Sequence, residues 1–388
     1  MKNHQQMFNN NHSVNSDKQP IKILMILENW GTGGTEAHVA QLGHYLKKYP
    51  EIEVYLIILQ GWEPAALANV ENWTKDIFLI NKKNRREALS NFYQIARKIS
   101  PDIYHLHLYS SLLPITLLLK QQKIGKLVTT LHMPITPWNW WHRLKWKLAI
   151  RFADVVTGVS TEVLKSIGMA DHGKFPHAHV ISPPCLPLDV KFKNEQSLQT
   201  QEKIFTVSAC GRLAKEKNWP ILLRAFAKFR TMVDKPVQLM HIGEGPLEQE
   251  ITALIMELEI HDCVDMKGRL PHSEVLAKIA TSDVFVLPSQ FEGLGMVALE
   301  AMQCGTPTIT ADFEASVDFI EDGITGHRFA RGDWSALAEL LFWHFLHPNE
   351  ANHIGKQGQR FVLEKYSEEN TFGKYVKLYN ALSRKRKI

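Results

Sequence analysis

The sequence predicts an α/β protein made of two Rossmann-like halves with a cleft between them. Strand-like runs alternate with helical runs, the alternation restarts in the second half, and a charged segment separates the two series. Alternation of this kind favours parallel sheets covered by helices. At 388 residues with 45% hydrophobic content, the chain is long enough for two domains, each with its own core.

The expected boundaries follow from where these runs begin and end. Residues 1–19 are rich in Asn, Gln and His and lack a hydrophobic segment, so they are expected to form a disordered tail. The first domain is expected over 20–190, the linker over 191–203 and the second domain over 204–367. The strands expected in order are 21–27, 54–59, 77–80, 103–108, 127–131 and 155–159 in the first domain, then 204–209, 237–242, 284–287 and 308–310 in the second.

Composition excludes several classes of protein. The four cysteines are far apart and form no CxxC or Cys/His cluster, so neither a disulfide framework nor a zinc site is expected, and a reducing cytoplasm fits. The longest apolar run, 112–119, is far shorter than the roughly 20 residues that cross a bilayer. Any membrane contact is therefore expected to be peripheral, on the inner face. The net charge of +5 is modest, and no base-stacking motif points to nucleic acid.

Two carboxylates near the C-terminal end carry the functional prediction. Glu292 follows the expected strand 284–287, and Glu300 lies just inside the helix expected over 296–304. Both can face a ligand at the carboxyl edge of the sheet, where open α/β sheets bind. Carboxylates accept hydroxyl donors and a helix N-terminus attracts anions, a combination that describes a nucleotide sugar. The alternative is a solvated Glu292 and a helix-surface Glu300.

The spacing Glu, seven residues, Glu resembles the hallmark of the retaining glycosyltransferases of family 4, which have the GT-B fold. The resemblance implies that Glu292 holds the hydroxyls of the donor sugar and that Glu300 holds the ribose hydroxyls. It places Gly295 and Met296 near sugar and phosphate. It also implies that 368–388 supply a helix crossing back to the first domain, followed by a basic tail.

The loop that opens the second domain supplies candidate cations. Arg212 and Lys217 match the basic pair of the family, and fixed cations there would stabilise the departing diphosphate. Lys215, between them, is expected to be solvated. Glu244, in a Gly-x-Gly-Pro turn, and Leu270 resemble residues that line the same site.

In the first domain, Gly33 and Gly34 lie in a glycine-rich loop after the first strand. The third glycine of a dinucleotide loop is replaced by Glu36, and the second strand ends without an acidic residue, which disfavours a nicotinamide enzyme. The resemblance places this loop beside the donor phosphate and the acceptor; the alternative is a tight turn. His132, at the end of a strand, matches a family histidine close to the donor sugar, and His107 is a similar candidate. An ordinary hydrogen-bonded core histidine is the alternative for both.

No DxD or metal-ligand spacing occurs, so no metal and no cofactor are expected beyond the nucleotide sugar itself. Hydrolase and NTPase motifs are also missing. One departure from the family pattern follows Asp312, where Phe313 and Glu314 replace a glycine-rich turn.

A basic, tryptophan-rich stretch over 137–152 contains no acidic residue. As a helix it is amphipathic, which is typical of a segment that lies on an anionic membrane. A stripe that packs into the core, with a solvated basic face, is an equal alternative. The residues assigned to membrane contact are Trp138, Trp141, Arg143, Lys145 and Lys147.

Together these patterns predict a retaining, metal-independent glycosyltransferase with a nucleoside-diphosphate sugar donor, UDP before GDP, and a glycan or lipid-linked acceptor. A GT-B-fold sugar-nucleotide epimerase is the enzymatic alternative, and a catalytically silent nucleotide-sugar-binding scaffold is the non-enzymatic one. The joint presence of Glu292, Glu300, Arg212 and Lys217 argues against the scaffold.

Overall fold

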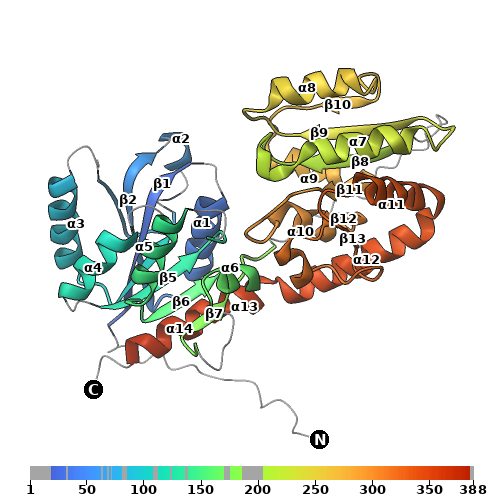
Figure 1. The fold of residues 1–388 in the computed structure, drawn as a ribbon. Coiled ribbons are helices and arrows are strands. Elements are labelled where there is room, and N and C mark those ends of the chain that lie inside the picture. The colour runs from blue at the N-terminus through green and yellow to red at the C-terminus, as the bar shows by residue number, and fades with distance from the viewer. Residues whose placement is uncertain are drawn as a thin grey trace, which may run out of the picture.

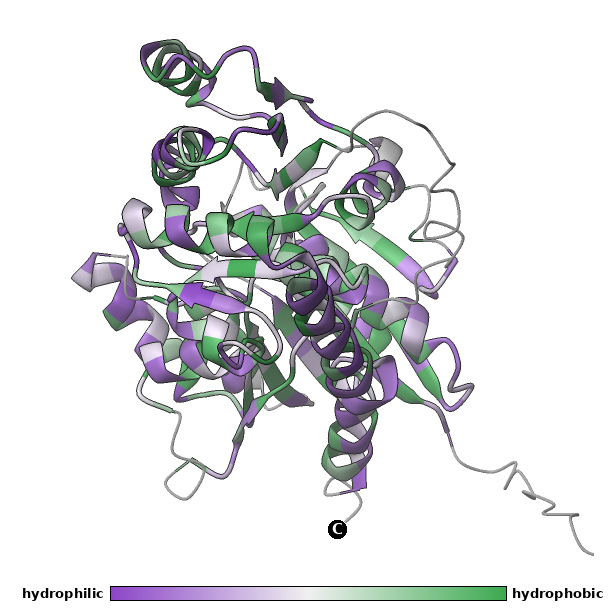
Figure 2. Ribbon diagram, turned by 90° about the vertical axis from the view of Figure 1, so that its right-hand side faces the viewer, coloured by the Kyte–Doolittle hydropathy of each residue, from purple (hydrophilic) through white to green (hydrophobic). Residues whose placement is uncertain are grey.

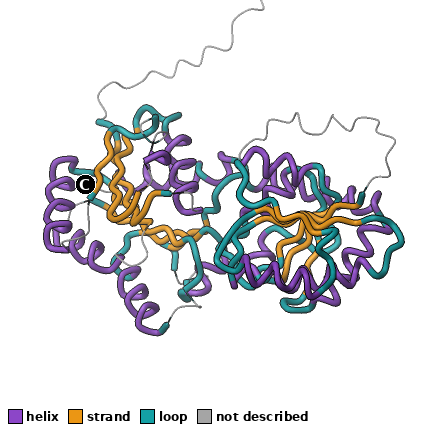
Figure 3. The backbone as a smooth tube through the Cα atoms, turned by 90° about the horizontal axis from the view of Figure 1, so that it is seen from above, coloured by secondary structure: helices purple, strands orange, loops and turns teal. Residues whose placement is uncertain are grey.

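The computed structural model confirms the predicted fold class: two parallel sheets, each flanked by helices, lie side by side (Figures 1 and 3). It describes residues 19–31, 34–62, 64–67, 70, 72–80, 85–107, 112–122, 125–135, 139–169, 175–185 and 204–384. The predicted linker 191–203, nearly all of the predicted tail and the last four residues lie outside these ranges.

The first sheet has the strand order β3-β2-β1-β4-β5-β6-β7, and its strands are parallel. Strand β7, which has only three residues, was not predicted from the sequence. The strands are β1 (Ile21–Trp30), β2 (Ile52–Trp62), β3 (Asp76–Leu79), β4 (Ile103–His107), β5 (Lys126–Leu131), β6 (Val155–Gly158) and β7 (Ala178–Val180). The helices are α1 (Gly34–Leu46), α2 (Pro64–Leu67), α3 (Arg85–Ile99), α4 (Leu112–Gln122), α5 (Trp140–Ile150) and α6 (Thr161–Ser166).

The second sheet has the order β10-β9-β8-β11-β12-β13 and is also parallel. Its central strand β11 is buried along its whole length, as the apolar run predicted. The strands are β8 (Phe205–Cys210), β9 (Val237–Ile242), β10 (Val264–Met266), β11 (Val284–Leu287), β12 (Thr308–Ala311) and β13 (His327–Phe329). The helical elements are η2 (Lys215–Lys217), α7 (Trp219–Arg230), α8 (Glu248–Glu257), α9 (His272–Ala280), α10 (Met296–Gln303), η3 (Glu314–Asp318), α11 (Trp334–Leu346) and α12 (Pro348–Lys365).

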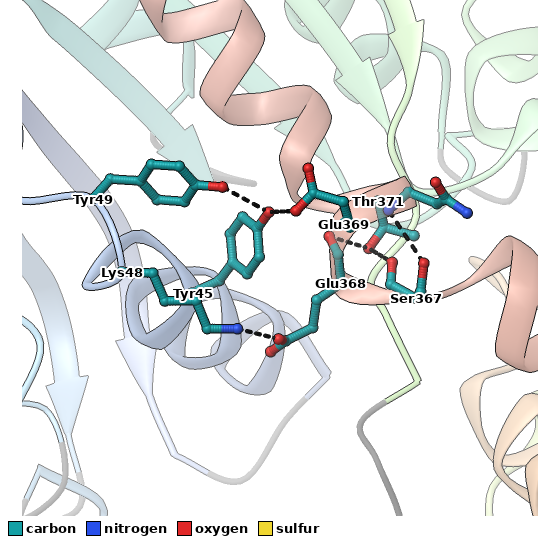
Figure 4. Close-up of polar contacts among 8 residues, drawn as sticks. Tyr45, Lys48, Tyr49, Ser367, Glu368, Glu369 and Thr371 are labelled. Atoms are coloured by element: carbon teal, nitrogen blue, oxygen red, sulfur yellow. Dashed lines mark hydrogen bonds and ion pairs between the residues drawn. The ribbon is translucent and has the colours of Figure 1, made fainter. Parts of the chain in front are cut away.

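The chain then returns to the first domain through α13 (Glu368–Thr371) and α14 (Gly373–Arg384), which lie beneath the first sheet in Figure 1. This confirms the predicted crossing helix. Tyr45 of α1 donates a hydrogen bond to Glu369 at 2.6 Å, and Lys48 pairs with Glu368 (Figure 4). Buried side chains of α14, Tyr375 and Tyr379 among them, join α1 in covering one face of the first sheet.

Hydrophobic residues concentrate along the strands, while the helices alternate between hydrophobic and hydrophilic residues (Figure 2). None of the helices within the described ranges combines the length and the apolar composition that crossing a bilayer requires.

Candidate active site between the two domains

Glu292 lies in the loop after β11 and forms an ion pair with Lys217. The Lys217 Nζ donates to Glu292 Oε1 at 2.6 Å, and the Ser289 hydroxyl donates to the same oxygen at 2.7 Å. The two charged side chains are only 18% and 15% exposed. The sequence predicted both residues for the site, but their direct contact joins segments 75 positions apart and was not expected.

Close backbone approaches bring these loops together. Gly211 follows β8 with a φ of +150°, and a Cβ on it would lie 3.4 Å from the Cε of Lys217. A Cβ on Gly243, after β9, would lie only 2.2 Å from the Gly211 carbonyl oxygen. Glycine is therefore required where the two loops meet. The Gln290 amide donates to the Glu216 carbonyl at 2.8 Å, which ties η2 to the loop that carries Glu292.

Arg212 does not share the Lys217–Glu292 contact. Its guanidinium pairs with Glu216 at 2.8 Å, and its side chain is two-thirds exposed. Glu244 is also exposed and lies 4.0 Å from Arg269. Leu270 is half-buried and packs against the hydrophobic core of the second domain. Lys215 is exposed, in agreement with its expected solvation.

Glu300 lies in α10, and His272 at the start of α9 contacts it. His272 Nε2 lies 3.0 Å from Glu300 Oε1, and this hydrogen bond raises the pKa of His272 above its ordinary value, while burial opposes the rise. His272 was not predicted from the sequence. Its position just after Pro271, at a helix start, is the only local signal, and nothing in it indicates a carboxylate partner.

Gly295 precedes α10 with φ of +89°, and Met296 is the first helical residue. A Cβ on Gly295 would lie 3.1 Å from the ring of Phe313, which is fully buried. The segment that departs from the family pattern thus packs beneath the start of α10. Arg331 pairs with Asp312 at 3.3 Å and with Glu314 at 3.0 Å, and it donates to the Gln290 carbonyl.

In the first domain, His132 follows β5 and contacts His107 at the end of β4. The distance between His107 Nδ1 and His132 Nε2 is 2.9 Å. Burial, together with neighbouring histidine rings, holds the pKa of both side chains well below the ordinary histidine value. Both therefore remain neutral near pH 7.

Two further histidines, which the sequence analysis did not select, complete this cluster. The ring of His38 in α1 lies 5.0 Å from that of His132, and the ring of His105 lies 4.1 Å from that of His107. His105 bonds to Tyr379 of α14 at 2.7 Å. The histidine cluster (His38, His105, His107 and His132) therefore contacts the crossing helix as well as the end of β5.

The two halves of the site meet at Gly293. A Cβ on this residue would lie 2.1 Å from the carbonyl oxygen of His132. Because real Cβ atoms do not approach so closely, only glycine permits this contact. Glu292 is thereby held within one residue of the point where the domains touch.

The remaining predicted residues contribute less to this geometry. Gly34 begins α1, is exposed, and has open space where a Cβ would lie. Gly33 lies outside the described residues. Among the described residues, no group of three or more His, Cys, Asp or Glu side chains is arranged to hold a metal ion.

Comparison with protein families identifies both domains. Residues 32–184 match the model described as Glycosyltransferase Family 4, and residues 190–361 match Glycosyl transferases group 1. The chain belongs to the family 4 glycosyltransferases. This confirms the resemblance that the sequence indicated and the transferase activity that it implied.

Relatives of this glycosyltransferase agree with the assignment. It is 29% identical to the N-acetyl-alpha-D-glucosaminyl L-malate synthase of Bacillus anthracis over 75% of this chain and 77% of that one. It is 27% identical to the MMP alpha-(1->4)-mannosyltransferase of Mycolicibacterium hassiacum, over 68% and 67% of the two chains. The crystal structure of Anabaena HepE in complex with UDP and glucose shares the fold, with a TM-score of 0.78, 17% identity and coverage of 93% and 100%.

Proposed function

We propose that this glycosyltransferase transfers a sugar from a nucleoside-diphosphate sugar, UDP in preference to GDP, to a glycan or lipid-linked acceptor hydroxyl. The anomeric configuration is retained, and no metal takes part. One observation carries the proposal: the largely buried Lys217–Glu292 pair of the second domain lies next to Gly293, which touches the backbone carbonyl of His132 in the first domain. A cation and a carboxylate thus lie next to the place where the backbone of His132 meets the second domain.

The negative charge that develops on the leaving diphosphate is stabilised by cationic side chains of this chain. Lys217 lies beside Glu292, where the donor sugar would sit, so its ammonium can stabilise the nearby phosphate as the glycosidic bond breaks. The exposed Arg212–Glu216 ion pair contributes little to stability, because water competes for both charged groups. Arg212 can therefore leave Glu216 and bind phosphate oxygens. The amides that open α10, at Gly295 and Met296, add donors for the same anion.

His132 serves as a neutral hydrogen-bonding group and not as an acid, because burial keeps its ring uncharged. His107 Nε2 is buried and has no hydrogen-bond partner in the part of the chain that the structure describes. A buried N–H without a partner is rarer than an unpaired lone pair, so we infer that His107 Nδ1–H donates to His132 Nε2. The proton of His132 then resides on Nδ1, which is available to a sugar hydroxyl.

Similar proteins support the donor and the stereochemistry. HepE was crystallised in complex with UDP and glucose, and the names of the two relatives specify alpha products or alpha linkages. A sugar-nucleotide epimerase is less favoured, because these relatives are named for glycosyl transfer or glycoside synthesis.

Product analysis tests the proposal. The protein is incubated with UDP- and GDP-linked sugars and a mixture of glycan and lipid acceptors, and the product is examined by NMR. A new alpha-glycoside formed from an alpha-linked donor, in the presence of chelator, is the expected result. An inverted linkage, an epimerised donor without an acceptor product, or loss of turnover with chelator would contradict it.

Alanine substitutions test the phosphate contacts. Lys217→Ala is expected to lower kcat by about 100- to 1,000-fold, as loss of one transition-state donor does, and Arg212→Ala is expected to act in the same direction. Lys215→Ala, which removes an exposed lysine from the same short helix, is the matched control. Equal rates for all three variants would remove Lys217 and Arg212 from the mechanism.

A further inference from the structure

Helix α5 presents an apolar ridge to solvent. It packs against the first domain through Trp146, Ala149 and Ile150, which are buried. The opposite side carries the apolar ridge (Trp141, Leu144 and Leu148), whose members are 57%, 42% and 43% exposed. The sequence left open whether these residues pack into the core, and in the structure they do not. Trp138 lies outside the described residues.

Tryptophan is concentrated at the start of the ridge. The rings of Trp140 and Trp141 stack with centroids 3.8 Å apart, and Trp140 is 60% exposed. Phe152, just beyond the helix, is exposed as well. A contiguous apolar surface of this kind on a folded domain indicates a binding partner.

Basic residues flank the ridge on both sides. At 100° per residue, Lys145 lies on one side of Leu144 and Leu148, while Lys147 and Arg151 lie on the other. Neither Lys145 nor Lys147 forms an ion pair with an acidic residue in the part of the chain that the structure describes, and no acidic residue occurs between 137 and 152. The cationic flanks therefore select an anionic partner that also accepts large apolar side chains.

We propose that α5 docks the first domain on an anionic lipid bilayer, with the apolar ridge inserted among the headgroups and the basic flanks against acidic lipid. Trp and Leu on one side and Lys and Arg beside them are the composition of a helix that lies in the interfacial plane. An acidic protein would satisfy the charges but offers no apolar layer of matching depth. This inference goes beyond the proposed function and does not depend on it.

The position of α5 in the first domain determines where a docked bilayer would lie relative to the candidate active site. Because α5 connects the parallel neighbours β5 and β6, its first turn lies at the carboxyl edge of the first sheet, where His132 follows β5. A bilayer against α5 would therefore lie close to the end of the first domain that contacts Gly293. An acceptor embedded in that bilayer is presented to this side of the molecule.

Vesicle sedimentation tests the charges. Full-length protein, without nucleotide, is mixed with vesicles of phosphatidylcholine alone or with phosphatidylglycerol. Binding is expected only with the acidic lipid and is expected to fall as salt rises above about 0.1 M, where charges are screened beyond about 10 Å. A variant with Lys145, Lys147 and Arg151 changed to Ser should bind on the order of 100-fold more weakly. The control variant changes Arg224, Lys228 and Lys356, three exposed basic residues of the second domain, to Ser.

The ridge is tested separately. Changing Trp141, Leu144 and Leu148 to Ala should abolish binding, while changing the exposed Met256, Leu346 and Leu363 to Ala should not. Brominated acyl chains should quench tryptophan fluorescence in the wild type and much less in the ridge variant. Circular dichroism and thermal unfolding verify that each variant is folded.

Three outcomes would overturn the proposal: no binding of wild type to acidic vesicles, equal binding by the ridge variant and its control, or a dimer in solution that the ridge variant dissociates. Nucleotide affinity, measured on the same samples, should be unaltered by both α5 variants. Failure to dock is therefore distinguishable from failure of the donor site.

Discussion

At the scale of single residues, each glutamate of the proposed donor site pairs with one basic side chain: Glu292 with Lys217 and Glu300 with His272. The environments differ. The first pair is largely buried, whereas His272 is 64% exposed. A buried pair costs much to separate because a lone charge remains out of water, and an exposed pair costs little. Glu300 is thus the carboxylate more easily released to a ligand.

Replacing Glu300 with Gln is expected to weaken nucleotide binding by about 1.5–3 kcal/mol, because a charged acceptor for the ribose hydroxyls becomes a neutral one. Calorimetric titration with free UDP measures the loss. Glu292→Gln is the companion variant: it should preserve nucleotide affinity and damage turnover. Unchanged affinity for the Glu300 variant would exclude this residue from the nucleotide site.

The His272–Glu300 pair should make the free energy of unfolding depend on pH. Since the hydrogen bond raises the pKa of His272 in the folded protein, the pair stabilises the fold fully below about pH 6.5, the ordinary histidine value. The contribution is lost as pH rises through the raised value. The free energy of unfolding should therefore differ most between wild type and His272→Gln at low pH, in urea titrations between about pH 5.5 and about pH 8.5. A difference that grows with pH would contradict the assignment.

At the scale of elements, α1 and α14 share one face of the first sheet and enclose the histidine cluster. The His38 ring lies 5.3 and 6.2 Å from the rings of Phe372 and Tyr375, and neither of its nitrogens has a hydrogen-bond partner among the described residues. Burial lowers the pKa of His38 to about 3. The crossing helix is therefore packed against a side chain that resists protonation.

Replacing His38 with Phe should reduce the acid sensitivity of folding. A histidine whose folded pKa is lowered loses stability as pH falls below the unfolded value of about 6.5, by about 1.4 kcal/mol per pH unit. At about pH 5 the variant should gain about 2 kcal/mol of unfolding free energy relative to its effect at about pH 7.5. His353→Phe, on the exposed surface of α12, is the control. Parallel pH dependence of the His38 variant and wild type would refute the prediction.

The sequence predicted most of the elements that position the site, because long apolar strands and capped helices leave a periodic pattern. The strands β7, β10 and β13 were missed, since three residues are too few to show alternation. The pairing of Lys217 with Glu292, the role of His272 and the packing of His38 against α14 were also missed. Each joins residues far apart in the chain, and no local pattern encodes such contacts. The roles assigned to the predicted site residues stay predictions.

At the scale of the whole molecule, the domains are joined by contacts of different kinds. Lys48 and Tyr45 bond to α13, the Thr161 amide donates to Asp318 across the domain boundary, and Gly293 touches the His132 carbonyl. The polar contacts involve side chains, which can change conformation if the domains shift. The Gly293 contact is between two backbone segments, which cannot adjust in this way.

Gly293→Ala is expected to force the loop of Glu292 away from the end of β5. Because the new methyl group would meet a carbonyl oxygen, a shift of the order of 1 Å is needed, and misplacement on that scale lowers turnover by about 100-fold. Thermal stability should change little, since neither core is touched. Gly61→Ala is the control, because among the described residues its methyl group would approach only the Asn29 side-chain oxygen, at 3.3 Å. Wild-type turnover in the Gly293 variant would show that the contact is not needed for catalysis.

The return of α14 to the first sheet also sets an order of events during synthesis. The strands and helices of the second domain, β8 to α12, are contiguous in sequence and complete as soon as they leave the ribosome. The first domain, although translated earlier, has one face of its sheet covered only in part, by α1, until Tyr375 and Tyr379 emerge. The half of the molecule that is made first is thus the last to finish folding, and its exposed strands are what a chaperone would meet on the nascent chain.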